Sequence, residues 1–207
     1  MAKVKKAFFC QNCGSQHTQW QGQCNTCKEW NTLVEEIIEK EAPKEWASES
    51  TKEITSPIRM DAIDVAEVPR IKTQDEELNR VLGGGLVPGS VILLGGEPGI
   101  GKSTLLLQVS LSLNSTVLYV SGEESQQQIK LRADRLIMKP ANLYILTETN
   151  TQQIFKHLIE LEPDLIIIDS IQTLYSDQIE SGPGSVSQIR ECALELMRFA
   201  KESATPI

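Results

Sequence analysis

A glycine-rich turn near the middle of the chain constrains the fold more than any other feature. It follows the apolar run 91–94, and residues 96–103 read Gly-Glu-Pro-Gly-Ile-Gly-Lys-Ser. This is the spacing of a phosphate loop, which connects a strand to a helix. Glycines let backbone N–H groups turn towards a polyphosphate, and a helix that begins near Lys102 directs its positive end at the same anion. The pattern predicts a strand over 91–94, a nucleotide cradle, and a helix over 105–113.

The loop residues form the candidate nucleotide site. Lys102 can reach the terminal phosphates of ATP, and the Ser103 hydroxyl can bind Mg²⁺. A glycine turn before a helix also occurs without any ligand, but here the strand before it and the helix after it favour a nucleotide. The candidate ATP-binding residues are Gly96, Glu97, Pro98, Gly99, Ile100, Gly101, Lys102, Ser103 and Thr104.

Two further apolar runs end in carboxylates. Residues 165–168 are aliphatic and lead into Asp169, and residues 117–120 lead through Ser-Gly into Glu123 and Glu124. The carboxyl ends of parallel strands are where open α/β sheets bind ligands. Asp169 is therefore a candidate Mg²⁺ ligand. Either glutamate could orient a water molecule as a general base, or both could simply begin the next helix, and spacing alone does not separate these readings.

The rest of the chain from residue 61 alternates between helical and strand patterns, which predicts an α/β fold with a mostly parallel sheet flanked by helices. We expect helices over 75–82, 126–138, 151–161 and 188–201, a strand over 143–146, and a mobile loop over 171–187. Residues 206–207 resemble the start of a further strand. Such a sheet would be truncated there, so we expect the chain to be part of a longer protein.

The N-terminal region has the spacing of a small metal site. Cys10, Cys13, Cys24 and Cys27 form two Cys-x₂-Cys pairs separated by ten residues. Such pairs are typical of tetrahedral Zn²⁺ sites, and four thiolates leave no open position for catalysis. About 30 residues bury too little apolar surface to fold without a metal. We expect a four-cysteine zinc finger over 1–34, a linker over 35–60 and an ATPase domain over 61–207.

For three other residues of the finger, the sequence permits more than one role. His17 lies between the cysteine pairs and could replace a ligand, but four cysteines suffice, so we expect a surface residue. Trp20 and Trp30 are expected to cover the metal knuckles. The alternative is that the two rings stack on nucleic-acid bases.

Charge and hydropathy exclude some classes of protein. The formal net charge is −8, which argues against a protein that coats nucleic acid over its whole surface but permits a local basic region. No apolar run is long enough to span a bilayer, and the start of the chain lacks the apolar core of a signal peptide. We expect a cytoplasmic protein with no membrane partner.

Together these motifs resemble the bacterial RadA/Sms family of DNA repair ATPases, relatives of RecA and of the DnaB helicases. The resemblance covers nearly the whole chain. Besides the cysteine pairs and the phosphate loop, it rests on the stretches that follow. They are Trp-Asn-Thr-Leu (30–33), Leu-Gly-Gly-Gly-Leu-Val-Pro-Gly-Ser (82–90), Tyr-Val-Ser-Gly-Glu-Glu-Ser (119–125), Leu-Arg-Ala-Asp-Arg-Leu (131–136), Ile-Asp-Ser-Ile-Gln-Thr (168–173) and Pro-Gly-Ser-Val-Ser-Gln-Ile-Arg-Glu-Cys (183–192).

The resemblance implies a RecA-like core that hydrolyses ATP, assembles as a hexameric ring, binds single-stranded and branched DNA, and drives branch migration of recombination intermediates. It implies that Glu123 is the catalytic glutamate and that the loop around 176–185 faces DNA. It also implies a RecA-type recombinase or the replicative helicase machinery as partner.

Two other hypotheses remain open from the residues. One is an ATP-switched module that docks a protein and hydrolyses slowly. The other is a binder of zinc and nucleotide without turnover in this chain alone.

Overall fold

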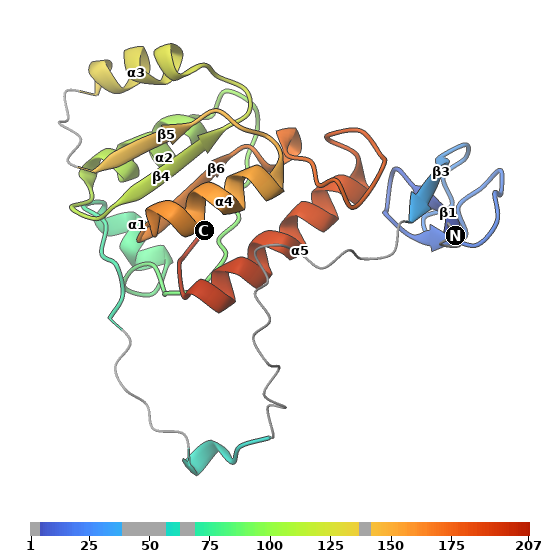
Figure 1. Cartoon of the computed structure of the whole chain (residues 1–207), viewed down its shortest axis with the longest axis horizontal. Helices are drawn as coiled ribbons and strands as arrows, with labels where there is room; N and C mark the ends of the chain where they lie inside the picture. Colours follow the sequence, from blue (N-terminus) through green and yellow to red (C-terminus); the bar gives the residue numbers. More distant parts are fainter. Residues whose placement is uncertain (1–4, 39–56, 63–68, 137–141) are drawn as a thin grey trace.

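The computed structural model describes residues 5–38, 57–62, 69–136 and 142–207, and in it a small N-terminal finger and an α/β body are distinct (Figure 1). In the finger, β1 (Lys5–Cys10) pairs antiparallel with β2 (Gln16–His17) and β3 (Leu33–Ile38), in the order β2-β1-β3. Cys10 lies opposite Leu33, and the pairing continues to Lys5 opposite Ile38. The finger therefore extends beyond the predicted boundary at residue 34, because β3 continues into the charged stretch that we assigned to the linker.

A parallel sheet forms the centre of the body. Its strands are β4 (Val117–Ser121), β5 (Leu143–Leu146) and β6 (Leu165–Asp169), in the order β5-β4-β6. Every residue of β4 is buried, as the apolar run predicts for a central strand. Ser121 is in register with Asp169, so the carboxyl ends of β4 and β6 lie at the same edge.

Helices cover both faces of this sheet, which confirms the predicted α/β class (Figure 1). On one face, α2 (Lys102–Ser112) and α3 (Gln126–Arg135) pack on alternate strand residues such as Val117 and Tyr119. On the other face, α4 (Thr151–Leu161) and α5 (Val186–Ser203) pack on the intervening residues Leu118, Val120 and Ile166. The period-two alternation of the strands thus divides the apolar side chains between two cores.

Polar side chains set where the helices begin. Asp75 caps α1 (Glu76–Val81), Asn150 caps α4, and Ser125 forms a capping box with Gln128 at the start of α3. The short 3₁₀ turns are η1 (Met60–Ala62) and η2 (Ile171–Thr173). The predicted helices agree with these elements to within a few residues, except that α3 is described only to Arg135, short of the predicted end at 138, which lies outside the described residues.

The predicted strand over 91–94 is not formed. Leu93 is 85% exposed and no strand is assigned to this segment. Its backbone meets residues 206–207 only at its start, where Ile207 accepts a hydrogen bond from the Ile92 N–H at 2.8 Å and donates one to Ser90 at 2.9 Å. Ile166 in turn donates to Pro206. The segment is extended but lacks a strand neighbour along most of its length, and a strand requires such backbone partners.

The loop between β6 and α5 is more closely packed than its polar composition suggests. Leu174 and Ser176 are fully buried. The Gln188 side chain on α5 accepts a hydrogen bond from the Ser176 N–H and donates to the carbonyls of Ser176, Ile179 and Ser181. We predicted a mobile loop, but the buried amide of Gln188 holds residues 176–181 of this loop against α5.

Among the described residues, none of the helices combines the length and apolarity needed to cross a bilayer.

Candidate functional site

The phosphate loop leads directly into the first turn of α2. Gly99 and Gly101 have φ angles of 80° and 103°, in the left-handed region that side chains other than glycine rarely adopt. Gly101 is the N-cap, and no side chain caps the exposed backbone N–H groups of the first turn. The Lys102 Nζ donates to the carbonyls of Gly96 and Glu97, each at 2.9 Å. The ammonium group therefore lies over the loop where the phosphates of a nucleotide would bind.

The predicted partners at this site, Ser103 and Asp169, are in direct contact. The Ser103 Oγ donates to Oδ1 of Asp169 at 3.0 Å, although the residues come from α2 and from the tip of β6. A hydroxyl and a carboxylate oxygen beside a phosphate loop are ligands that suit Mg²⁺. The donor set therefore fits the metal that the sequence predicts.

Tyr119 and Arg132, to which the sequence analysis gave no role in the site, approach Asp169 at the carboxylate oxygen that Ser103 does not contact. The Tyr119 hydroxyl donates to Oδ2 of Asp169 at 2.5 Å, and Arg132 lies 3.3 Å from the Tyr119 oxygen and 3.9 Å from the same Oδ2. Burial and the hydrogen bond to Asp169 raise the pKa of Tyr119 far above its ordinary value, so the phenol stays a donor. Oδ2 is thus engaged, and Oδ1 faces the loop.

The two glutamates after β4 have different partners. Glu123 is exposed, and its Oε1 accepts a hydrogen bond from the Ser170 hydroxyl at 2.7 Å, next to Asp169. Glu124 forms an ion pair with Arg132 at 2.7 Å, and both side chains are partly buried. The sequence left the two equivalent, whereas the structure commits Glu124 to an internal ion pair and leaves Glu123 at the solvent edge.

A glycine makes this arrangement possible. Gly122 separates Ser121 from Glu123, and its N–H donates to the Asp169 carbonyl at 3.2 Å. A Cβ atom at this position would lie 2.1 Å from Oγ1 of Thr173 and 2.8 Å from Cγ2 of Thr149. The close approach of Thr173 and Thr149 to the end of β4 therefore requires a residue without a side chain.

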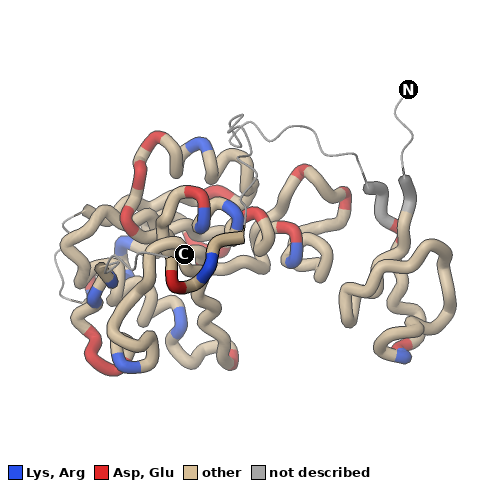
Figure 2. The backbone as a smooth tube through the Cα atoms, turned by 90° about the horizontal axis from the view of Figure 1, so that it is seen from below, with Lys and Arg blue, Asp and Glu red and all other residues tan. Residues whose placement is uncertain are grey.

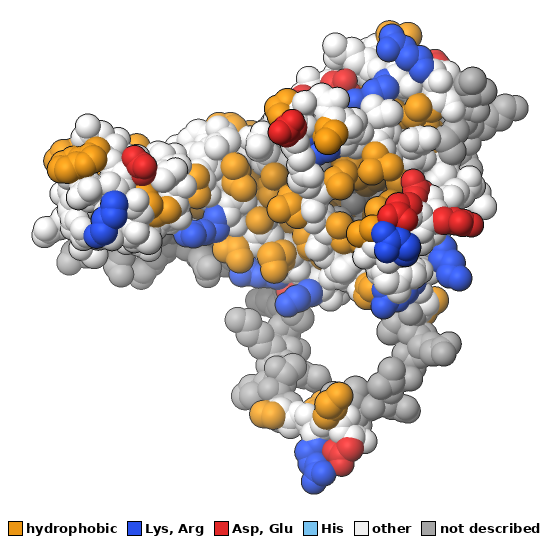
Figure 3. Space-filling view, turned by 180° about the vertical axis from the view of Figure 1, so that it is seen from behind, with side chains coloured by type: hydrophobic (Ala, Val, Ile, Leu, Met, Phe, Trp, Pro, Cys, Tyr) orange, Lys and Arg blue, Asp and Glu red, His pale blue; other side chains and the backbone are white. Residues whose placement is uncertain are grey.

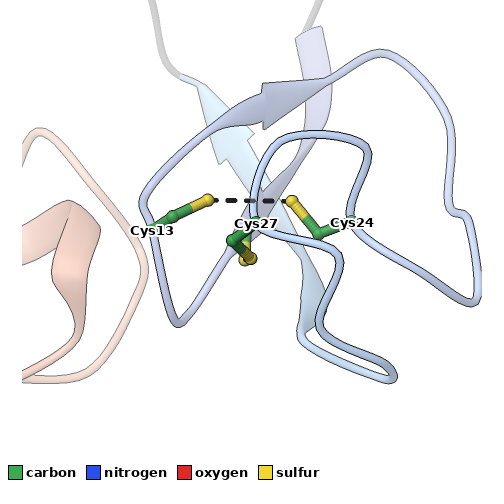
Figure 4. Close-up of side chains that lie close together, drawn as sticks. Cys13, Cys24 and Cys27 are labelled. Carbon is green, nitrogen blue, oxygen red and sulfur yellow. Dashed lines mark hydrogen bonds between the residues drawn. The ribbon is translucent and has the colours of Figure 1, made fainter.

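The four predicted cysteines come together in the finger. Figure 4 shows three of them, Cys13, Cys24 and Cys27, close together. Their sulfur atoms all lie within 4.8 Å of one another, with Cys10–Cys27 at 3.6 Å and Cys13–Cys24 at 3.7 Å. Four thiolates bound to Zn²⁺ at about 2.3 Å in a tetrahedron are about 3.8 Å apart. The cluster therefore fits Zn²⁺ and is of the zinc-ribbon type.

Electrostatics in the cluster favour a bound cation. The backbone N–H of Cys27 and the Ser15 hydroxyl lower the pKa of Cys24 to about 4. The pKa of Cys27 is raised to about 11, because burial and the neighbouring Cys10 and Cys13 sulfurs outweigh the backbone N–H of Glu29. Sulfurs this close do not all ionise without a positive charge between them, which a divalent metal supplies.

Two expectations for the finger were wrong. His17 is half-buried rather than at the surface, and its Nε2 lies 3.0 Å from the Ser15 Oγ and 3.5 Å from the Cys24 sulfur, so it supports the cluster from outside. Trp20 and Trp30 do not cover the metal knuckles, because they are 58% and 67% exposed. The buried Cys10 and Cys24 pack instead with Leu33 and the half-buried Phe8.

The finger lies against the start of α5. The Arg190 guanidinium donates to the Gly14 carbonyl at 2.8 Å, and a Cβ at Gly14 would meet the Val186 side chain at 2.7 Å. Beside this contact is a cavity of about 460 Å³ between finger and loop; its lining residues are Gln11, Val34, Glu35, Glu180, Ser181, Gly182 and Ser185. The sequence analysis did not predict the contact between Arg190 and Gly14, because local sequence patterns do not relate positions that are 176 residues apart.

Comparison with known proteins agrees with this division. Residues 56–202 match the family described as "AAA domain", and residues 8–35 match the "Rubredoxin metal binding domain". The chain is 50% identical to the DNA repair protein RadA of Bacillus subtilis (strain 168), over all of this chain and 46% of that protein. The proteins of the same name from Pseudomonas aeruginosa and Listeria monocytogenes are 47% and 48% identical, over 100% and 97% of this chain and 46% and 45% of theirs.

The chain thus spans about half the length of the curated relatives it matches. The AAA match covers the sheet, the phosphate loop and both carboxylate tips, and the metal-domain match covers the cysteine cluster. The chain therefore belongs to the AAA domain family, and along its whole length it is a RadA/Sms-like sequence.

Proposed function

We propose that the protein is a DNA repair ATPase that binds single-stranded and branched DNA and promotes branch migration by hydrolysing ATP. The contact between Ser103 and Asp169 carries this proposal, because it joins a phosphate loop to an acidic strand tip as a Mg²⁺–nucleotide site requires. The relatives named DNA repair protein RadA supply the biological setting.

Each part of the site has a role in this proposal. The backbone of residues 96–104 cradles the phosphates, and Lys102 contacts the terminal ones. Ser103 and Asp169 would hold Mg²⁺, which neutralises charge that develops on the phosphates when it is bound. Tyr119 and Arg132 orient Asp169 through its other oxygen.

Glu123 is the proposed general base. It is exposed beside Asp169, and its carboxylate is oriented by the Ser170 hydroxyl. Glu124 is a poorer candidate because its ion pair with Arg132 would have to break before it could accept a proton from water. The proposal therefore assigns water activation to the first of the two glutamates.

The resemblance to the RadA/Sms family is also the basis for our proposal on assembly and location. We assign the whole protein to a hexameric ring in the cytoplasm, with a RecA-type recombinase or replicative helicase as partner. The loop around 176–185 would face the DNA, and its anchoring by Gln188 gives it a defined shape for that role.

Nucleotide binding and DNA-stimulated hydrolysis test the proposal separately. Lys102→Ala should weaken binding of a fluorescent ATP analogue by about 10- to 100-fold, because a charge-assisted contact to phosphate is lost. Lys130→Ala is the matched control, since Lys130 is an exposed lysine on α3 that forms an ion pair with Asp134. Hydrolysis by the protein should increase with single-stranded DNA. Hydrolysis absent in both conditions, or unaffected by Lys102→Ala, would contradict the proposal.

A second candidate is an ATP-switched docking module with slow hydrolysis. The contact between Arg190 and Gly14 favours it, because the finger rests on the helix that follows the loop, where a nucleotide-dependent shift could move it. This candidate predicts that a partner protein, and not DNA, accelerates hydrolysis.

A further inference from the structure

Two exposed tryptophans of the finger, Trp20 and Trp30, have no role in the site described above. Trp20 and Trp30 are the most exposed large apolar residues of the finger. Both rings converge on Gly22: a Cβ there would lie 3.6 Å from Cζ3 of Trp30 and 4.0 Å from Cη2 of Trp20. A tryptophan normally buries much of its large surface, so two neighbouring exposed rings indicate an interaction site.

We infer that Trp20 and Trp30 form a stacking platform for the unpaired bases of single-stranded nucleic acid. Aromatic faces bind bases of any sequence, because every base offers a π-face. The inference rests on the proposed function in one respect: that function supplies single-stranded DNA as the ligand.

The surroundings of the two rings favour nucleic acid over a protein partner. Both rings come from the segment 18–32, which contains no aliphatic side chain, whereas a protein-binding patch is typically rich in apolar side chains at its centre. The segment carries exposed side-chain amides instead, at Gln19, Asn25 and Asn31. Such amides can hydrogen-bond to the edges of bases. In Figure 3 the outer end of the finger shows hydrophobic atoms bordered by polar surface.

Charge is compatible with a nucleic-acid ligand on the finger. Residues 1–34 contain four lysines and one glutamate, whereas the whole chain has a formal charge of −8. Acidic positions are spread along the α/β body in Figure 2, and few charged positions occur on the finger. Lys28, two residues before Trp30, is exposed and forms no ion pair within the described part of the chain. Phosphates would therefore meet less repulsion at the finger than over the body.

The position of the finger also suits this role. Through Arg190 and Gly14 it rests on α5, directly after the loop proposed to face DNA. Val34 of the finger lines the cavity on the side of that loop and is 48% exposed. The finger that carries the two rings is therefore a direct neighbour of that loop.

The test is a double-mutant cycle between the rings and the bases. Binding of a labelled oligothymidylate to the zinc-loaded full chain is measured by fluorescence anisotropy without nucleotide, and again with a strand of the same length that has abasic sites. Each change of Trp20 or Trp30 to Ala should weaken binding of the normal strand roughly 5- to 150-fold. The same change should leave binding of the abasic strand unaltered.

Substitutions that separate aromatic stacking from folding complete the test. Phe at both positions keeps an aromatic face and should retain most of the affinity, whereas Leu keeps apolar bulk and should lose it. Zinc content is measured for each variant, and only variants that keep one zinc per chain are compared. Equal affinities of the Trp, Phe and Leu proteins for the normal strand, or equal effects of a substitution on both strands, would overturn the inference.

Failure of this inference is distinguishable from failure of the proposed function. The anisotropy measurement requires no ATP hydrolysis, and binding of the ATP analogue should be the same in the tryptophan variants. Stacking on a base releases no counterions, whereas phosphate contacts do, so loss of a ring should leave the slope of log Kd against log salt concentration unchanged. A slope that falls when a ring is removed would count against stacking.

Discussion

The Ser103 hydroxyl donates a hydrogen bond to Oδ1 of Asp169 at 3.0 Å, although the two residues are 66 positions apart. Ser103 lies in the first turn of α2, and Asp169 is the last residue of β6. Tyr119 holds the other carboxylate oxygen from the neighbouring strand. A phosphate loop and an acidic strand tip are thus assembled into one site by three elements.

Asp169→Asn should weaken Mg²⁺-dependent nucleotide binding by more than about 100-fold, because the neutral amide removes the ligand charge. Tyr119→Phe should weaken it by about 10- to 100-fold, since only the orientation of Asp169 is lost. Titration of Mg²⁺ against the nucleotide-bound chain by calorimetry measures both. Tyr144→Phe, at a half-exposed tyrosine of β5, is the control. An unchanged Mg²⁺ affinity of Tyr119→Phe would show that the phenol does not position the carboxylate.

The two glutamates should respond differently to the same change. Glu123→Gln should reduce ATP hydrolysis by roughly 10²- to 10⁴-fold with nucleotide binding retained, as expected for loss of a general base. Glu124→Gln should instead weaken the ion pair with Arg132 and lower stability, with a smaller effect on hydrolysis. Steady-state kinetics and thermal unfolding measure the two quantities. If both variants lose turnover equally, the assignment to Glu123 is incorrect.

Gly122→Ala should destabilise the fold by about 1–3 kcal/mol, because the added methyl group would overlap with Thr173 and Thr149. Gly182→Ala is a suitable control: a Cβ at Gly182 has no neighbour within 4 Å, so we expect a change within about 0.5 kcal/mol. Urea unfolding of the two variants gives the comparison. Equal stabilities of the two variants would mean that Thr173 and Thr149 can move away from a methyl group at position 122 without cost.

Removal of zinc by a chelator should unfold the finger and leave the α/β body folded, because only the finger depends on the metal for its core. Cys24→Ser should have the same effect, whereas Cys192→Ala should leave the zinc content at one per chain, since Cys192 lies in the core under α5. Metal analysis and amide exchange of β1 and β3 report the result. Retained protection of β1 after chelation would contradict the structural role of the metal.

The Cys192 thiol should be unreactive in the native protein. Burial, and then the charges of Glu195 and Glu191, raise its pKa to about 12 from an ordinary 9.0. Because the unfolded state ionises first, this group favours the folded state below pH 9 and that contribution is lost as the pH rises from about 9 to 12. Thiol titration of the zinc-loaded chain at pH 8, with and without denaturant, checks this. Rapid modification of Cys192 without denaturant would contradict the assignment.

Local sequence was enough for most of the elements of the α/β body and for the separate halves of each site. The phosphate loop follows from glycines at positions that need positive φ, and β4 and β6 follow from uninterrupted apolar runs. The metal cluster follows from its spacing, because each Cys-x₂-Cys pair turns about one metal. These features depend on neighbours within a few residues, which a sequence displays directly.

Only the tertiary structure decided how these parts meet. It paired Glu124 with Arg132 and left Glu123 beside Ser170, it placed Tyr119 behind Asp169, and it put Gly14 against Arg190. It also left residues 91–94 without strand neighbours and turned Trp20 and Trp30 to the solvent. The physical reason is the same in each case: exposure and hydrogen bonding depend on groups that are distant in the chain, whereas periodicity and spacing report only on near ones.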